Sequence, residues 1–142
     1  MDCDRHLLAM TFCSRPSRLK LLRCVLRDVA DIVCLNEEDT DAVVLAVNEA
    51  CMNIIQHAYA MRQDGKIELS VFRESDVLVF HLRDYAERVD PEKIKPRNLD
   101  DVRPGGLGIH LISELMDESC FLEPPVDGGN LFEMKKFINK RG

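Results

Sequence analysis

Apolar residues at helical spacing define two segments in the first half of the chain. One follows the Ser14-Arg15-Pro16 break and continues to Leu35, with apolar positions at Leu19, Leu22, Leu26, Val29 and Val33. The other follows Asn36, and its apolar residues share one arc of a helix: Val43, Val44, Val47, Cys51, Ile54, Ile55 and Ala58. Pro16 suits a first helical turn, and Asn36 followed by three acidic residues is typical of a helix start. The pattern predicts two amphipathic helices packed on a core.

Alternating patterns predict strands before and after these helices. Residues 6–12 alternate, with Leu8, Met10 and Phe12 on one side. Two runs, around residues 67–71 and 78–82, are separated by Glu74-Ser75-Asp76, as in a β-hairpin. Residues 119–122 and 130–138 are predicted as a second pair of strands. Between the two pairs, residues 109–116 have helical spacing.

This order of elements predicts an α+β fold. Strand, helix, helix, hairpin, helix and hairpin suit a two-layer α/β sandwich, with a mixed, mostly antiparallel sheet and three helices on one face. At 142 residues the chain is near the usual size of one domain, so a single domain over residues 1–142 is expected. Residues 85–104 contain three prolines and little periodicity. A connection of that length is typical of a lid or binding loop.

Composition narrows the classes of partner and compartment. The net charge of −6 and the pI near 5.2 argue against direct binding of nucleic acid, which needs clustered Lys and Arg. No apolar run is long enough to span a bilayer and no basic-then-apolar leader is present, so a cytoplasmic protein without a membrane partner is expected. The six cysteines contain no CxxC pair, and we expect them to be reduced core residues. They are Cys3, Cys13, Cys24, Cys34, Cys51 and Cys120.

Polar residues recur along one flank of the second predicted helix. Glu49, Asn53 and His57 stand at i, i+4 and i+8, which places a carboxylate, a carboxamide and an imidazole one above another. A solvated helix face would explain any one of them alone. Asp84 has the parity of the apolar residues in its strand, so its carboxylate is directed toward the helix-covered face. From parity alone, an Asp that ends the strand in a turn is an equally good interpretation.

Glycines precede the last predicted helix. The segment Pro104-Gly105-Gly106-Leu107-Gly108 runs directly into the helical pattern that begins at Ile109. Free backbone N–H groups at a helix N-terminus can bind phosphate oxygens, whereas a flexible hinge is the simpler alternative. The preceding long connection and the polar helix upstream favour phosphate binding.

Taken together, these motifs resemble those of a known family. Glu49-x-x-x-Asn53-x-x-x-His57-Ala58-Tyr59 is similar to the N-box of the GHKL (Bergerat-fold, histidine-kinase-like) ATPases, and most similar to that of the anti-sigma-factor serine/threonine protein kinases. The resemblance covers nearly the whole chain. It continues in four further stretches, at residues 84–91, 105–112, 115–118 and 128–130. The family usually has Asp-x-Gly-x-Gly at the first of these stretches, and here Ala86 and Arg88 replace the two glycines.

The resemblance implies a role for each motif. Glu49 is expected to be the catalytic base, Asn53 the Mg²⁺ ligand, and Asp84 the acceptor for the adenine amino group. Mg²⁺ prefers oxygen ligands and keeps several waters, so one neutral side-chain oxygen and the phosphates of ATP or ADP suffice. The other nucleotide-binding positions that the resemblance implies are Ala86, Arg103, Gly105, Gly106, Leu107, Gly108, Ile109 and Asn130. His57 is interpreted as a core histidine.

Three function classes fit these observations. The first is an ATP-dependent serine/threonine protein kinase of the anti-sigma-factor type, which phosphorylates a small antagonist protein in a partner-switching pathway. It would bind a sigma factor or another effector, and a homodimer is compatible with it. The second is a non-catalytic module of the same fold that sequesters a protein partner. The third, a histidine-kinase catalytic core, lacks room for dimerisation helices that carry a phosphoaccepting histidine. Glu49 favours the kinase, and the replaced glycines favour the sequestering module.

Overall fold

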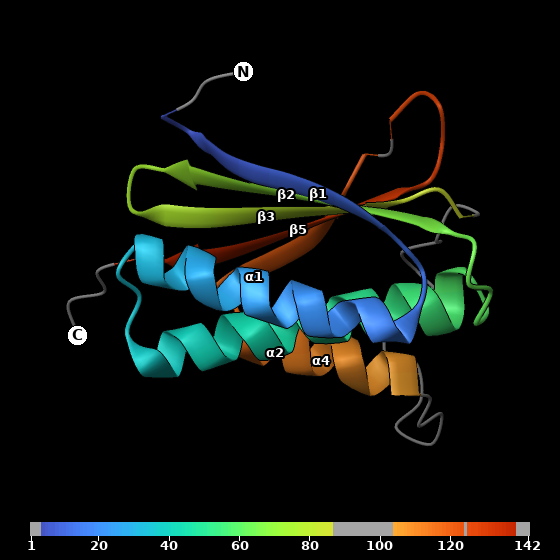
Figure 1. Ribbon diagram of the computed structural model, residues 1–142, viewed down its shortest axis with the longest axis horizontal. Coiled ribbons are helices and arrows are strands. Elements are labelled where there is room, and N and C mark those ends of the chain that lie inside the picture. Colours follow the sequence, from blue (N-terminus) through green and yellow to red (C-terminus); the bar gives the residue numbers. More distant parts are fainter. Residues whose placement is uncertain (1–3, 87–103, 124, 139–142) are drawn as a thin grey trace.

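The computed structural model describes residues 4–86, 104–123 and 125–138, with the backbone alone for residues 104–107. Its first half contains β1 (His6–Cys13), η1 (Pro16–Arg18), α1 (Leu19–Ile32), α2 (Glu37–Asn53) and the π-helical turn η2 (Ile54–Ala58). The second half contains β2 (Lys66–Glu74), β3 (Val77–Asp84), α4 (Pro104–Leu115), β4 (Glu118–Leu122) and β5 (Asn130–Phe137). Figure 1 shows these elements in chain order. The strands and helices predicted from periodicity are therefore present.

The strands form one five-stranded sheet in the order β1-β2-β3-β5-β4. Every neighbouring pair among the described strands is antiparallel, so the predicted mixed sheet is corrected to an antiparallel one. In this register Asp84, at the end of β3, lies between Ile67 of β2 and Asn130 of β5.

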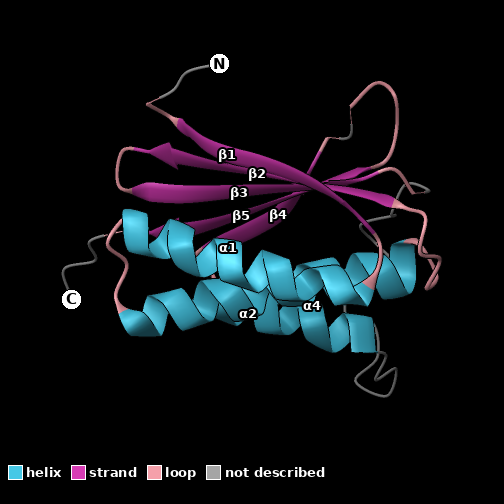
Figure 2. Ribbon diagram, viewed as in Figure 1, coloured by secondary structure: helices cyan, strands magenta, loops and turns pink. Residues whose placement is uncertain are grey.

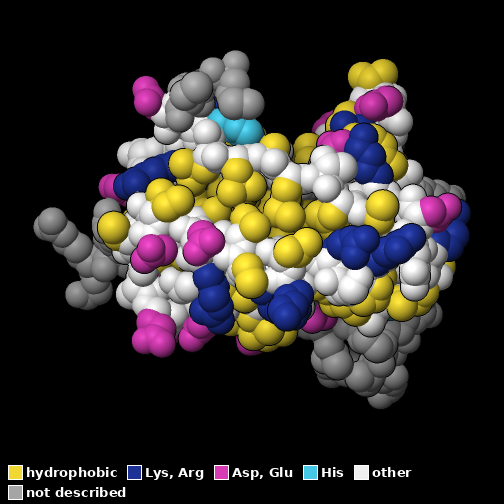
Figure 3. Space-filling model, viewed as in Figure 1, with side chains coloured by type: hydrophobic (Ala, Val, Ile, Leu, Met, Phe, Trp, Pro, Cys, Tyr) yellow, Lys and Arg dark blue, Asp and Glu magenta, His cyan; other side chains and the backbone are white. Residues whose placement is uncertain are grey.

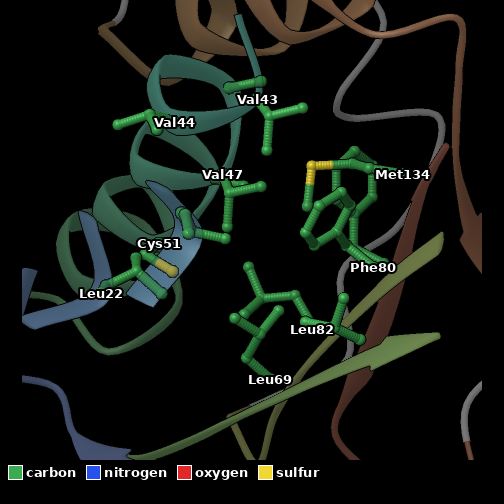
Figure 4. Close-up of a cluster of buried hydrophobic side chains, with 14 of the residues drawn as sticks. Leu22, Val43, Val44, Val47, Cys51, Leu69, Phe80, Leu82 and Met134 are labelled. Carbon is green, nitrogen blue, oxygen red and sulfur yellow. The ribbon is translucent and has the colours of Figure 1, made fainter. Parts of the chain in front are cut away.

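Helices α1, α2 and α4 cover one face of the sheet, and the predicted two-layer sandwich is confirmed (Figure 2). Inward-facing residues of the central strands meet the apolar arcs of the helices. Figure 4 shows this core, in which Val47 and Cys51 of α2 face Leu69, Phe80 and Leu82 of the sheet. Side chains such as Phe80 and Leu22 are completely buried. Burial of these apolar surfaces holds α2 rigidly against the sheet.

Local sequence signals explain the ends of the first two helices. Asn36 caps α2, because its side-chain oxygen accepts a hydrogen bond of 2.7 Å from the Asp39 N–H. The acidic first turn of α2 also suits the positive end of the helix dipole. Helix α1 ends at Ile32, three residues before the predicted limit at Leu35, and Cys34 follows with a positive φ of 59°. A left-handed residue of this kind stops a helix.

The helix that begins at Glu37 changes to π-helical geometry after Asn53. In η2 the Tyr59 N–H donates to the Ile54 carbonyl, five residues earlier. Ile54 and Ile55 remain buried in this π turn, so the apolar arc continues after Asn53. His57 lies on the polar flank of the helix and is exposed, so its interpretation as a core histidine is wrong.

The cysteines that the structure describes are free, but most are not in the core. Cys51 is buried, whereas Cys13, Cys24, Cys34 and Cys120 are exposed. The expectation of core cysteines is therefore wrong for these four, because each lies on an outward-facing position of its strand, helix or turn. Within the described part of the chain, no helix has the length and apolar character needed to cross a membrane.

Candidate active site

Glu49 and Asn53 of α2 meet Gly108 of α4 at the helix–helix contact. A Cβ atom on residue 108 would lie 2.5 Å from Glu49 Oε1 and 2.9 Å from both Asn53 Oδ1 and Asn53 Nδ2. Such distances are shorter than any ordinary contact, so a larger residue at position 108 would require both polar side chains to move. The structure thus brings together three of the residues that the motifs singled out, from segments more than fifty positions apart in the chain.

The Asn53 carboxamide has no hydrogen-bond partner in the part of the chain that the structure describes. Both Oδ1 and Nδ2 are buried, and neither has a hydrogen-bond partner among the described residues. Leaving a buried amide unsatisfied is costly, and a bound water or ion at the carboxamide would remove that cost. A single neutral oxygen donor of this kind fits Mg²⁺, which takes its other ligands from waters and phosphates.

Asp84 forms a second polar cluster at the end of β3. Its carboxylate is buried, with 2% of the residue exposed, which decides between the two interpretations that parity alone left equally good. Asp84 Oδ1 accepts hydrogen bonds from Asn130 Nδ2 at 2.9 Å and from the Ala86 N–H at 3.0 Å. Burial raises the pKa of Asp84, and hydrogen bonds from Asn130 and from the Ala86 N–H act in the opposite direction. The cluster presents a buried acceptor suited to an amino group.

Backbone geometry fixes the position of Asp84 from the β5 side. Gly129 has a φ of +84°, and a Cβ on it would lie 2.1 Å from the Asp84 carbonyl oxygen. The loop before Asn130 therefore packs directly on the Asp84 backbone, which only glycine permits. The motifs include residues 128–130 but assign no role to Gly129. The signal that could have identified it is its position immediately before the strand that pairs with Asp84.

The other predicted nucleotide-binding positions lie partly in α4 and partly outside the described residues. Gly105, Gly106 and Leu107 belong to the first turn of α4, where backbone N–H groups have no partner within the helix. Gly108 lies just beyond this turn and packs against α2, while Ile109 packs on the core. Arg103 and most of the predicted lid, residues 85–104, lie outside the described residues.

Fold and site together define a class of protein. In this chain three helices cover one face of an antiparallel sheet, and Glu49 and Asn53 of α2 face Gly108 of α4. This is the arrangement expected of histidine-kinase-like ATPases. Residues 12–136 match the family model described as the histidine kinase-like ATPase domain, and the chain belongs to this family. The resemblance inferred from the motifs is thereby confirmed.

Individual relatives of this chain are named for a specific activity. The chain is 29% identical over 135 residues to a serine-protein kinase RsbW of Bacillus licheniformis, covering 89% of this chain and 82% of that protein. It is 29% identical to RsbW of Bacillus pumilus, with 94% and 87% covered, and 28% identical to RsbW of Staphylococcus epidermidis, with 99% and 92% covered. The activity for which these relatives are named agrees with the kinase activity that the motifs predicted.

A solved structure supports the fold independently. A chain in the crystal structure of the SiaB–SiaC complex from Pseudomonas aeruginosa aligns with a TM-score of 0.66. The alignment covers 95% of this chain and 92% of that chain at 19% identity. At this level of identity the likeness concerns the fold.

Proposed function

We propose that this chain is an ATP-dependent serine/threonine protein kinase of the anti-sigma-factor type. The observation that carries the proposal is the contact of Glu49 and Asn53 with Gly108, which joins a carboxylate and an unsatisfied carboxamide at the start of a helix. The serine-protein kinases among its relatives support the same activity. A kinase and a sequestering module of this fold share these motifs. The reactivity of Glu49 and Asn53 therefore has to distinguish the two functions.

The proposed roles follow from the position of each side chain. The Asn53 oxygen would hold Mg²⁺, which neutralises charge on the phosphates during transfer. Glu49, one helical turn away, accepts the proton of the attacking serine or threonine hydroxyl. Backbone N–H groups in the first turn of α4 bind phosphate oxygens. Asp84 accepts a hydrogen bond from the adenine amino group, since its carboxylate is buried and fixed by Asn130.

The substrate follows from the same class of protein. We propose an antagonist protein with a phosphorylatable serine or threonine, and a sigma factor or another effector as the second partner. A protein partner is supported by the structural neighbour, which was solved in the SiaB–SiaC complex, and by the relatives named serine-protein kinase. The cytoplasm is the proposed site of action, since the five described cysteines are free, as in a reducing compartment.

We also propose that two copies of this chain associate. Leu21 and Ile32 of α1 are large apolar side chains that are 61% and 71% exposed. Figure 3 shows hydrophobic side chains gathered along the middle of the face over β1 and α1. Strand β1 is also an edge of the sheet, so its outer backbone groups are available for pairing.

Phosphotransfer by Glu49→Gln tests the kinase proposal. The substitution keeps the shape of the side chain and the packing on Gly108 but removes the base, so transfer of labelled phosphate to the antagonist encoded nearest to this chain should fall roughly 10²- to 10⁴-fold. ADP and Mg²⁺ should still bind. Glu38→Gln, on the exposed first turn of the same helix, is the matched control and should retain full activity.

Asn53→Ala should fail differently, because it removes the proposed Mg²⁺ ligand. Calorimetry should show that nucleotide binding no longer depends on Mg²⁺, and phosphotransfer should be lost with it. A sequestering module predicts no phosphate on the partner with any variant and unchanged partner binding by Glu49→Gln. Full-rate transfer by Glu49→Gln would contradict the assignment of the base even in an active kinase.

A further inference from the structure

Tyr59 follows the helix that bears Glu49 and Asn53, and its hydroxyl bonds to the start of β2 and to the residue after β3. The residue is buried, with 4% exposed, and follows directly after η2. Its hydroxyl donates to the Lys66 carbonyl at 2.6 Å, where β2 begins, and accepts the Tyr85 N–H at 2.7 Å, where β3 ends. One side chain thus completes two strand ends that lie next to each other in the sheet.

The chain builds a specific seat for this ring. A Cβ on Gly65 would lie 2.5 to 2.6 Å from three carbon atoms of the Tyr59 ring, so residue 65 must be glycine for the ring to lie there. Gly65 is itself held by Ser14: its N–H donates to Ser14 Oγ at 3.0 Å, and its carbonyl accepts the Ser14 N–H at 2.7 Å. The π turn of η2 sets the direction from which the side chain approaches, since it shifts Tyr59 off the α-helical arc.

The peptide that Tyr59 holds is the one that follows Asp84. Tyr85 N–H points to the Tyr59 hydroxyl, and the next N–H, of Ala86, donates to the Asp84 carboxylate. On the opposite side Gly129 packs on the Asp84 carbonyl. The turn that carries the carboxylate is therefore held between η2 and the loop before β5, and the hydroxyl of Tyr59 ties it to the helix of Asn53.

We infer that Tyr59 is a positioning residue for recognition of the nucleobase. By holding the Tyr85 N–H it directs the Asp84 carboxylate toward the adenine amino group and fixes it relative to the helix that bears Asn53. This inference rests on the proposed function, in which Asp84 reads adenine. It goes beyond that function because it assigns base selectivity to a residue that need not touch the nucleotide.

Tyr59→Phe tests the inference because it keeps the ring on Gly65 and removes only the hydroxyl. The measurement is calorimetric affinity for ADP and for IDP, which carries a carbonyl in place of the amino group, each with Mg²⁺. We expect the wild type to prefer ADP and the variant to lose roughly 3- to 10-fold of that preference, as for a misplaced hydrogen bond. Affinity for IDP should change little, since the phosphate and Mg²⁺ contacts remain.

Two further variants separate positioning from folding. Tyr85→Phe removes a hydroxyl that bonds Glu68 on the exposed side but keeps the Tyr85 N–H, so it should retain the wild-type preference. Gly65→Ala keeps the Tyr59 hydroxyl but displaces the ring, and should lose preference as Tyr59→Phe does. Thermal unfolding of each variant identifies those that remain folded at the temperature of the measurement.

The outcomes distinguish a failure of this inference from a failure of the proposal that Asp84 binds adenine. A wild type that binds ADP and IDP equally would overturn the role of Asp84, and this inference with it. A wild-type preference that Asp84→Asn abolishes but Tyr59→Phe leaves intact would overturn the inference alone. Equal losses of ADP and IDP affinity in Tyr59→Phe would also overturn it, because a purely structural role weakens both.

Discussion

Asp84 is a buried carboxylate whose hydrogen-bonding capacity is largely used inside the protein. A carboxylate offers roughly four acceptor positions. The Asn130 side chain and the backbone N–H groups of Ala86 and Asn130 take three of them. The remaining capacity suits one more donor, which the adenine amino group would supply. Ala86 is compatible with this turn although the family has glycine there, because its N–H still reaches Asp84 and its methyl group is buried.

Asp84→Asn should therefore weaken binding of ADP without unfolding the protein. The amide can present a donor where adenine also presents one, and loss of a hydrogen bond to a charged group costs about 1.5–3 kcal/mol, or roughly 10- to 100-fold in affinity. Calorimetry with ADP and Mg²⁺ measures the change. Asp127→Asn is the control, because this exposed carboxylate bonds Arg83 and not the proposed site. Equal ADP affinity for Asp84→Asn and the wild type would remove Asp84 from the site.

The same substitution should change how stability depends on pH. Burial raises the folded-state pKa of Asp84 above the ordinary 3.8, so the folded protein binds a proton more readily than the unfolded chain. Wild-type stability should then decrease as pH rises from about 3.8 through the raised folded-state pKa. The amide of the Asp84→Asn variant cannot ionise, so the free energy of unfolding of the variant, relative to the wild type, should increase over that interval. Urea unfolding at about pH 4 and about pH 7 measures this; an unchanged difference would contradict the cost of burying the charge.

At the scale of the elements, the site depends on the close approach of α2 and α4. Gly108 is the point of contact, and both polar side chains of α2 lie against it. The C-terminal end of α4 is held separately, since buried Lys136 of β5 donates to the Leu115 carbonyl at 2.6 Å. Lys136 Nζ also lies 3.6 Å from Asp39 Oδ1 in the first turn of α2. Lys136 of β5 thus contacts both helices, α4 at its C-terminal end and α2 at its first turn.

Gly108→Ala should damage the site more than the fold. The added methyl must displace Glu49 and Asn53, and displacements of about 1 Å in such residues cost roughly 10²-fold in rate. Overpacking of this kind costs about 1–3 kcal/mol of stability. Phosphotransfer and thermal unfolding measured together give both effects, with Ser113→Ala on the exposed side of α4 as the control. Full activity in Gly108→Ala would show that the helix contact is not part of the site.

Local sequence patterns predicted the helices and strands well. They did not predict contacts between segments that are distant in the sequence. Periodicity located the helices and strands, because these depend on neighbouring residues, whereas the parity of Asp84 left its burial undecided. The motifs also selected Glu49, Asn53 and Gly108, which the structure brings together. The π turn and the contact of Tyr59 with Gly65 could not be predicted, since each arises from how α2 packs at its end.

At the scale of the whole molecule, two exposed apolar side chains of α1 bear on the proposed homodimer. Leu21 and Ile32 are eleven residues apart, which is close to three helical turns, so they lie on one face of the helix. Against association stands the net charge of −6 on each copy, which makes two chains repel.

Leu21→Glu combined with Ile32→Glu should lower self-association at least about tenfold, because charged groups in an apolar contact lose hydration. Sedimentation velocity over a range of concentrations measures it. Val126→Glu is the matched control, since this side chain is fully exposed in the loop before β5. Wild-type association should also strengthen as salt rises from about 0.01 to 0.15 M, where screening shortens from roughly 30 to 8 Å and reduces the repulsion. A chain that stays monomeric at every concentration, or a Val126→Glu variant that dissociates equally, would show that this face of α1 does not join two copies.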